Sequence, residues 1–133
     1  MRPKFLPLLA FTAAVVASSS ALALDLNSFR AANGLPALRV NARFSSAANA
    51  HAKDMAQRGS MDHNGFQERM GKIARTAAEN VAWGCETKDC VFQMWAGSPG
   101  HRANMLRADI TGYGLASAKG GNGQRYWVLE LGN

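Results

Sequence analysis

Three side chains of the kinds that bind metals or transfer protons stand in short polar or Gly/Pro-containing segments. They are His63 in DHNG, Glu79 in AENVAWG and His101 in SPGHRANML. Imidazole and carboxylate groups are common ligands of Zn²⁺ and common general acids and bases. Loops carry functional residues more often than helix faces do. We therefore treat the three as one candidate site, in which a turn at Pro99-Gly100 places His101.

The residue types alone do not show that these three residues form one site. They are 16 and 22 positions apart, and no local motif such as H-E-x-x-H connects them. On this basis the simpler interpretation, in which each is a separate loop or capping residue, is preferred. Ser98 is not expected to be a nucleophile, because the chain has no G-x-S-x-G elbow. His51 lies on the apolar face of a predicted helix, where we expect a core histidine with a hydrogen-bond partner.

Both cysteines of the chain, Cys85 and Cys90, lie in the segment GCETKDC. Their spacing is not C-x-x-C and there is no third thiol, so a redox pair or a metal site is less favoured than a disulfide. In an exported protein an even number of cysteines at short range favours a structural disulfide. We expect that bond to stabilise the fold by roughly 2 kcal/mol.

The first 23 residues are typical of a secretory signal peptide. Arg2 and Lys4 precede an apolar run too short to span a bilayer, and residues 21–23, Ala-Leu-Ala, form a small-residue cleavage site. We therefore expect a signal peptide over residues 1–23 and one domain over residues 24–133. The mature chain is expected to have no transmembrane segment and to be secreted, either extracellular or periplasmic.

The charge of the chain gives no sign of a nucleic-acid partner. The formal net charge of +6 falls to +4 when Arg2 and Lys4 are removed. The remaining basic residues alternate with acids and form no basic block, so we expect no nucleic acid as the natural partner. Arg102 and Arg107 are expected to be surface residues or to brace a loop rather than to bind an anion.

The hydrophobic pattern predicts helices in the first part of the chain and strands in the second. Short helices are expected over residues 25–32 and 89–96, with helical turns over 66–70 and 101–106. The strongest periodicity, from Phe44 to Met55, predicts an amphipathic helix capped by Asn41 and ended by Gly59. Its many alanines indicate close packing against another element.

Alternating residues predict the strands. A short strand is expected over residues 79–83, and a hairpin joins residues 112–115 and 126–131 through KGGNGQ. Gly112 and Gly114, on one face of the first hairpin strand, indicate that another element approaches the backbone closely. Trp residues 83, 95 and 127 each lie in an apolar period and are expected in the core. Helices followed by strands favour an α+β fold or a layered sandwich.

Six segments, taken in order, resemble the CAP superfamily of cysteine-rich secretory proteins, insect venom antigens and plant pathogenesis-related proteins. They are LNSFRAANGLPALRVN, AANAHAKDMAQRG, DHNG, AENVAWG, MWAGSPGHRANML and ITGYGLASAKGGNGQRYWVLELG. The resemblance covers nearly all of the predicted mature chain and is strongest to the short single-domain bacterial members. It implies a three-layer α-β-α sandwich with a central antiparallel sheet, that is, an α+β fold.

The resemblance also implies a cleft in which histidines and acids converge. By motif, His63 corresponds to the first cleft histidine, Glu79 to the first acid and His101 to the second histidine, and some members hold a divalent metal there. In larger members a second glutamate follows a Trp by three positions, where this chain has Ser98, which would therefore line the cleft. The chain also lacks a cysteine-rich C-terminal extension, and the segments that bind lipids in some relatives are short or absent.

These implications predict a secreted, non-enzymatic binding domain. Its cleft would hold Zn²⁺, or another divalent metal, through His63 and His101, with Glu79 as third ligand or as the residue that orients a ligand. The expected partner is a small ligand, a polysaccharide or a protein, and the expected state is a monomer. Two alternatives stay open: a metal-assisted hydrolase or peptidase with Glu79 as base, and a domain that acts through its surface, in which His101 hydrogen-bonds Glu79 in a vestigial cleft.

Overall fold

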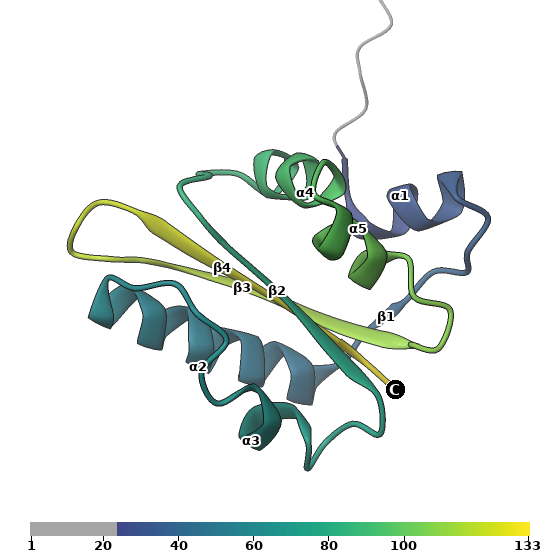
Figure 1. Ribbon diagram of the computed structural model, residues 1–133, viewed down its shortest axis with the longest axis horizontal. Helices are drawn as coiled ribbons and strands as arrows, with labels where there is room; N and C mark the ends of the chain where they lie inside the picture. Colours follow the sequence, from purple (N-terminus) through teal and green to yellow (C-terminus); the bar gives the residue numbers. More distant parts are fainter. Residues whose placement is uncertain (1–23) are drawn as a thin grey trace, which may run out of the picture.

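The computed structural model describes residues 24–133, which form one sheet between two layers of helices (Figure 1). The predicted signal peptide therefore lies outside the described residues. The strands are β1 (Arg39–Val40), β2 (Ala77–Trp83), β3 (Gly112–Lys119) and β4 (Arg125–Gly132). The helices are α1 (Leu26–Ala32), α2 (Ala42–Arg58), α3 (Phe66–Met70), α4 (Lys88–Ala96) and α5 (Pro99–Met105).

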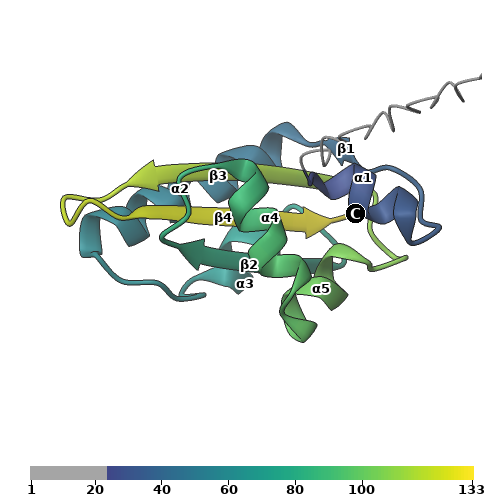
Figure 2. The same ribbon diagram turned by 90° about the horizontal axis from the view of Figure 1, so that it is seen from above.

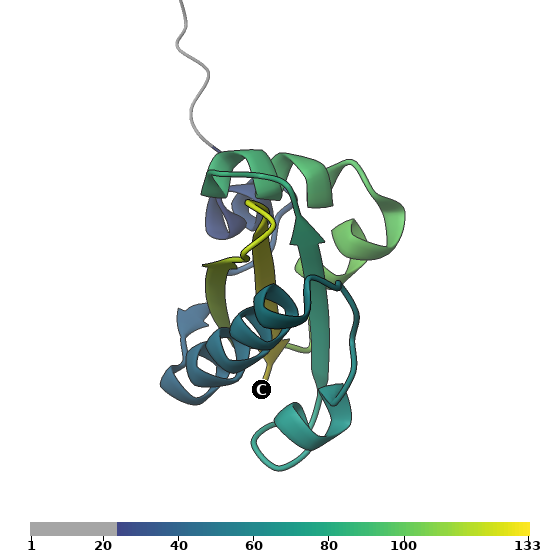
Figure 3. The same cartoon turned by 90° about the vertical axis from the view of Figure 1, so that its left-hand side faces the viewer.

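The sheet has the strand order β1-β3-β4-β2. The pairs β3–β4 and β4–β2 are antiparallel, as predicted, whereas the two-residue β1 pairs parallel with the start of β3. Helices α2 and α3 cover one face, and α1, α4 and α5 cover the other (Figures 1 and 3). Seen from above, α4 crosses the sheet near the middle of its strands (Figure 2). The predicted α-β-α sandwich is thus confirmed.

Helix α2 begins and ends where the sequence predicts. The Asn41 side chain accepts hydrogen bonds from the backbone N–H groups of Arg43 and Phe44, and Gly59 ends the helix in the left-handed conformation. The buried alanines of α2 bring its backbone against β3. A Cβ atom at Gly114 would overlap the backbone of Phe44 and Ser45, so only glycine allows this approach.

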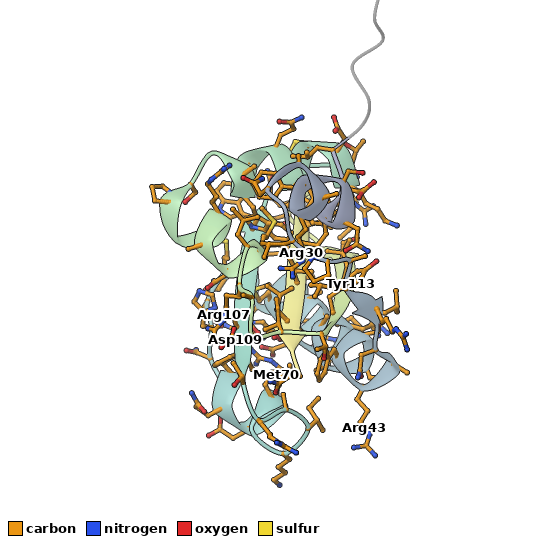
Figure 4. The ribbon with its side chains drawn as sticks, turned by 90° about the vertical axis from the view of Figure 1, so that its right-hand side faces the viewer. Arg30, Arg43, Met70, Arg107, Asp109 and Tyr113 are labelled. Atoms are coloured by element: carbon orange, nitrogen blue, oxygen red, sulfur yellow. A yellow bond between two sulfur atoms is a disulfide. The ribbon has the colours of Figure 1, made fainter. Side chains whose placement is uncertain are left out.

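An arginine that is fully buried joins elements within the opposite layer. Arg30 lies on the sheet side of α1 (Figure 4) and donates hydrogen bonds to the backbone carbonyls of Pro36, Met105 and Arg107. In the same layer the indole N–H of Trp95 donates to Val81 O at 3.2 Å. These bonds tie α1 to α5, and α4 to β2.

The predicted disulfide between Cys85 and Cys90 is present. Two local predictions are wrong. Residues 99–100 do not form a separate turn but the first turn of α5, because Pro99 fits the first position of a helix, where no N–H is needed. Trp83 is 51% exposed rather than part of the core, because no helix covers the end of β2. None of the helices formed by residues 24–133 is both long enough and apolar enough to cross a membrane.

Candidate functional site

Strand β2 presents its residues alternately to the two helical layers, and this alternation determines which side chains meet. Glu79, Val81 and Trp83 face α2, whereas Asn80 faces α5, where its amide donates to the backbone carbonyl of His101 at 3.0 Å. The residues of the predicted site therefore approach the edge strand β2 from both faces of the sheet.

Glu79 is buried and is held by two cationic or potentially cationic side chains. Its Oε1 atom lies 2.7 Å from Nδ1 of His63, and its Oε2 atom accepts a hydrogen bond from Nη2 of Arg69 at 2.5 Å. His63 comes from the loop after α2 and is 56% exposed, while Arg69 comes from the short helix α3 and is only 14% exposed. The structure thus brings His63 and Glu79 together, as predicted.

His51 of α2 lies directly beneath this pair. It is 2% exposed, and its Nε2 atom is 2.7 Å from the backbone oxygen of Asp62 and 3.9 Å from Oε1 of Glu79. The prediction of a core histidine with a hydrogen-bond partner is therefore confirmed. Asp62 precedes His63 in the loop after α2. Its backbone oxygen contacts His51 and its carboxylate accepts a hydrogen bond from Arg58 at the end of α2, so both contacts hold this loop in place.

Glu130 is a member of this group that the sequence analysis missed. It lies on the central strand β4, directly opposite Glu79 in the β2–β4 pairing, and it is completely buried. Its Oε1 atom is 3.4 Å from Nε of Arg69, so this arginine contacts both carboxyl groups. Its Oε2 atom has no hydrogen-bond partner among residues 24–133. We refer to His51, His63, Arg69, Glu79 and Glu130 together as the Glu79 cluster.

The two carboxyl groups of the Glu79 cluster differ in protonation. Burial, followed by the hydrogen bond to Glu79 and the negative charge of Glu79, raises the pKa of Glu130 to about 9. Burial alone would also raise the pKa of Glu79, but hydrogen bonds from Glu130, Arg69 and His63 outweigh it and leave this pKa below its ordinary value. At neutral pH the cluster therefore holds an ionised Glu79 beside a protonated Glu130, whose O–H group can donate a hydrogen bond to Glu79.

His101 lies in the first turn of α5 and makes no direct contact with Glu79 or His63 among the hydrogen bonds and ion pairs of residues 24–133. Its Nδ1 atom is buried without a hydrogen-bond partner in the described part of the chain. Burial, and secondly the electrostatic effect of His63 when that ring is protonated, lowers the pKa of His101. His101 is thus within electrostatic range of His63, and it is neutral at pH 7.

The remaining predicted site residue, Ser98, is the N-cap of α5 and is half-buried, but its hydroxyl makes no capping hydrogen bond. Its place in a cleft stays a prediction. Within residues 24–133, no three His, Cys, Asp or Glu side chains are grouped as the ligands of a metal would be.

A sheet between two helical layers, with a histidine–carboxylate pair at an edge strand, defines a class of α-β-α sandwich domains. Residues 25–131 match the model of the CAP family, described as the cysteine-rich secretory protein family. The chain belongs to this family.

Individual relatives agree with this assignment. The uncharacterized protein YkwD of Bacillus subtilis (strain 168) is 30% identical over 104 residues, which are 72% of this chain and 40% of the relative. The chain therefore spans about two fifths of the length of this curated relative.

Solved structures show the same fold. An outer surface protein from Borrelia burgdorferi superposes with a TM-score of 0.72 at 20% identity, over 81% of this chain and 86% of its own. An extracellular protein containing a SCP domain from Bacillus anthracis superposes with a TM-score of 0.70 at 24% identity, over 80% of this chain and 37% of its own.

Proposed function

We propose that this chain is an exported CAP domain that acts by binding rather than by catalysis, with the Glu79 cluster at its binding site. The observation that carries the proposal is the pairing of the Glu79 carboxylate with both Arg69 and His63. A general base needs a carboxylate that is free to take a proton, and an arginine bonded to one oxygen lowers that basicity. Glu130 is protonated at neutral pH and is not a base either.

A divalent metal, with zinc as the first choice, is the cofactor that we propose for this site. The hydrogen bond from Nδ1 of His63 to Glu79 leaves Nε2 of the exposed imidazole free. Metal-binding histidines commonly make such a bond to a carboxylate, which fixes their tautomer and orientation. His101 fits as a second ligand because its lowered pKa keeps it neutral and its Nδ1 has no partner in the described part of the chain.

Glu79 does not fit as a third ligand of this metal, because Arg69 occupies its second oxygen and would repel a cation. The proposed site therefore has two protein ligands, with Glu79 orienting His63. A zinc ion held in this way would supply open positions for a donor atom of a bound ligand. A small molecule, a polysaccharide or a protein remain the partner classes that we propose.

Export is proposed from the signal-like residues 1–23, and the disulfide at Cys85 supports it because such bonds persist in oxidising compartments. Two solved relatives are titled an extracellular protein and an outer surface protein, which agrees with this proposal. Secretion of the precursor, with cleavage after residue 23 detected by mass spectrometry, would test it.

Zinc titration by calorimetry at pH 7.5 tests the metal site. We expect one site in the wild-type protein, lost in both His63→Ala and His101→Ala. Arg102→Ala, which changes the exposed neighbour of His101, serves as the control and should keep the site. Absence of zinc binding in the folded wild-type protein would overturn the metal site and leave a surface-acting domain with a vestigial cleft. Zinc-dependent cleavage of a peptide library that disappears in His101→Ala would instead favour the hydrolase.

A further inference from the structure

An open pocket of about 400 Å³ lies beside the Glu79 cluster, at the end of β2. Its lining consists of Gly59, Ser60, Met61, Trp83, Asn122 and Tyr126. These residues come from the end of α2, from the loop that leads to His63, from β2, from the β3–β4 turn and from β4. A pocket of this size, lined by aromatic side chains and a few polar groups, is in the range of small-molecule binding sites.

The pocket has an aromatic wall that the fold itself leaves uncovered. Trp83 is 51% exposed and Met61 is 43% exposed, although both lie beside a well-packed core. The other two tryptophans use their indole N–H groups internally, since Trp95 donates to Val81 O and Trp127 donates to Cys85 O. The indole N–H of Trp83 has no such acceptor among residues 24–133, so both its ring face and its donor remain for a ligand.

The polar groups of the pocket are neutral. Tyr126 forms part of the lining, and its hydroxyl accepts a hydrogen bond from Nδ2 of Asn122 at 2.9 Å, which leaves the hydroxyl proton available. Ser60 adds a second, exposed hydroxyl. No Asp, Glu, Lys, Arg or His lines the pocket, although the described part of the chain is basic. A charged ligand would therefore find no counter-ion there.

We propose that this pocket binds a neutral saccharide unit, with one sugar ring stacked on Trp83 and its hydroxyl groups bonded to Tyr126, Asn122 and Ser60. A pyranose ring has an apolar face of C–H groups and a rim of uncharged hydroxyls, which matches an indole face surrounded by hydroxyl and amide groups. A purely apolar ligand would leave these polar groups without partners, at a cost in binding free energy.

The pocket lies on the same face of the sheet as the Glu79 cluster, but no residue of the cluster lines it. Trp83 and Glu79 lie on the same face of β2, four residues and therefore about 13 Å apart along the strand. Residues 60–63 run beside β2 from the pocket to His63. An oligosaccharide bound at Trp83 would thus extend towards the cluster, while its first ring needs no metal.

Binding can be followed through the indole N–H signals in ¹⁵N–¹H correlation spectra. We would titrate the protein with cellotriose, maltotriose and N,N′,N″-triacetylchitotriose, all neutral, in the presence of EDTA. The expected result is a saturable shift of the Trp83 indole signal with at least one of these sugars, while the buried Trp95 signal stays in place. No saturable shift at tens of millimolar sugar would overturn the proposal, as would equal shifts of both signals.

Variants locate the site. Trp83→Ala should weaken the affinity for the sugar by about tenfold or more, measured by sugar-observed saturation transfer, with folding verified from the dispersion of the same spectra. Met94→Ala is the matched control, because Met94 is an exposed apolar residue of α4, on the other face of the sheet. Unchanged affinity in Trp83→Ala would refute the pocket.

The metal proposal is tested separately, because sugar binding by the wild-type protein should be the same with and without EDTA. Loss of sugar binding on addition of EDTA would assign the saccharide to the metal and overturn this inference. Binding of an apolar dye at Trp83, with none of the sugars bound, would also overturn it in favour of an apolar ligand.

Discussion

Replacement of Glu130 by glutamine should change how the stability of the protein depends on pH. The folded protein keeps the Glu130 proton up to about pH 9, whereas the unfolded chain releases it above the ordinary pKa of a glutamic acid. Between these values the folded state binds one more proton than the unfolded state. The free energy of unfolding therefore falls as the pH rises, by about 1.4 kcal/mol per pH unit for one proton.

The expected magnitude follows directly from this slope. From pH 5.5 to pH 7.5 the wild-type protein loses up to about 2.7 kcal/mol that Glu130→Gln does not lose. The amide has the shape of the protonated carboxyl and keeps a donor for Glu79, but it has no proton to lose. The stability of the variant relative to the wild type should therefore rise by about 2–3 kcal/mol over this interval.

Urea denaturation at pH 5.5, 6.5 and 7.5, in EDTA, measures this difference. Other groups that titrate in this range contribute equally to both proteins and cancel. Glu86→Gln is the control, because Glu86 is 53% exposed and pairs with Lys119 and Arg125 at the surface. Its effect should be within about 1 kcal/mol and independent of pH. A difference between wild type and Glu130→Gln that is the same at all three pH values would refute a protonated Glu130.

Three further predictions concern the rest of the fold. Gly114→Ala should destabilise the protein by about 3 kcal/mol or more in thermal or urea unfolding, because the added Cβ meets backbone, whereas Gly121→Ala, where nothing lies within 4 Å, should change stability by less than about 0.5 kcal/mol. Reduction of the Cys85–Cys90 disulfide should cost about 2 kcal/mol in the same assay, and no change on reduction would contradict a bond that constrains the unfolded chain. Since the pKa of His101 is lowered, the unfolded state binds more protons below about pH 6.5, so stability should rise as the pH increases towards that value. His101→Asn should flatten this part of the melting-temperature profile, and an unchanged profile would show that His101 titrates normally.

The features that the sequence predicts well are those with a repeating pattern. The apolar period from Phe44 to Met55 and the cap residue Asn41 predict α2 nearly to the residue. Two small residues on one face of a strand, Gly112 and Gly114, predict the close approach of another element, and a side-chain atom at Gly114 would indeed meet the backbone of α2. Such patterns depend on local geometry and burial, so the predictions made from them hold in the folded structure.

The features that it misses depend on pairing between distant segments. Strand β1 has two residues and is formed only because β3 lies beside it. The sequence does not reveal the role of Arg69, which lies in a short helix. Arg69 contacts Glu79 and Glu130 only because the β2–β4 pairing places these two carboxyl groups side by side. The sequence did contain a signal for Glu130. It occupies the same face of the strand as Tyr126 and Val128, which are both buried, so its carboxyl group must face the interior and needs a partner there.

Trp83 shows the opposite case. Trp83 does lie in an apolar period of the sequence. The period does not reveal that α2, the helix on this face of the sheet, ends at Arg58 before it covers Trp83. The assignment of Pro99-Gly100 to a separate turn failed for a related reason, since these two residues are compatible with both a turn and the first turn of a helix. Which of the two forms is decided by the tertiary packing of α5.

The order of the strands also determines when this protein can fold. Strand β4, residues 125–132, lies between β3 and β2 and is the last of the four to be synthesised. Until it leaves the ribosome, β2 has no neighbour in the sheet. The sheet should therefore form only after residues 125–132 have been synthesised, because the decisive pairings join segments some fifty residues apart, as between Ala77 and Gly132. A chain that must stay unfolded while it crosses a membrane would gain from this delay.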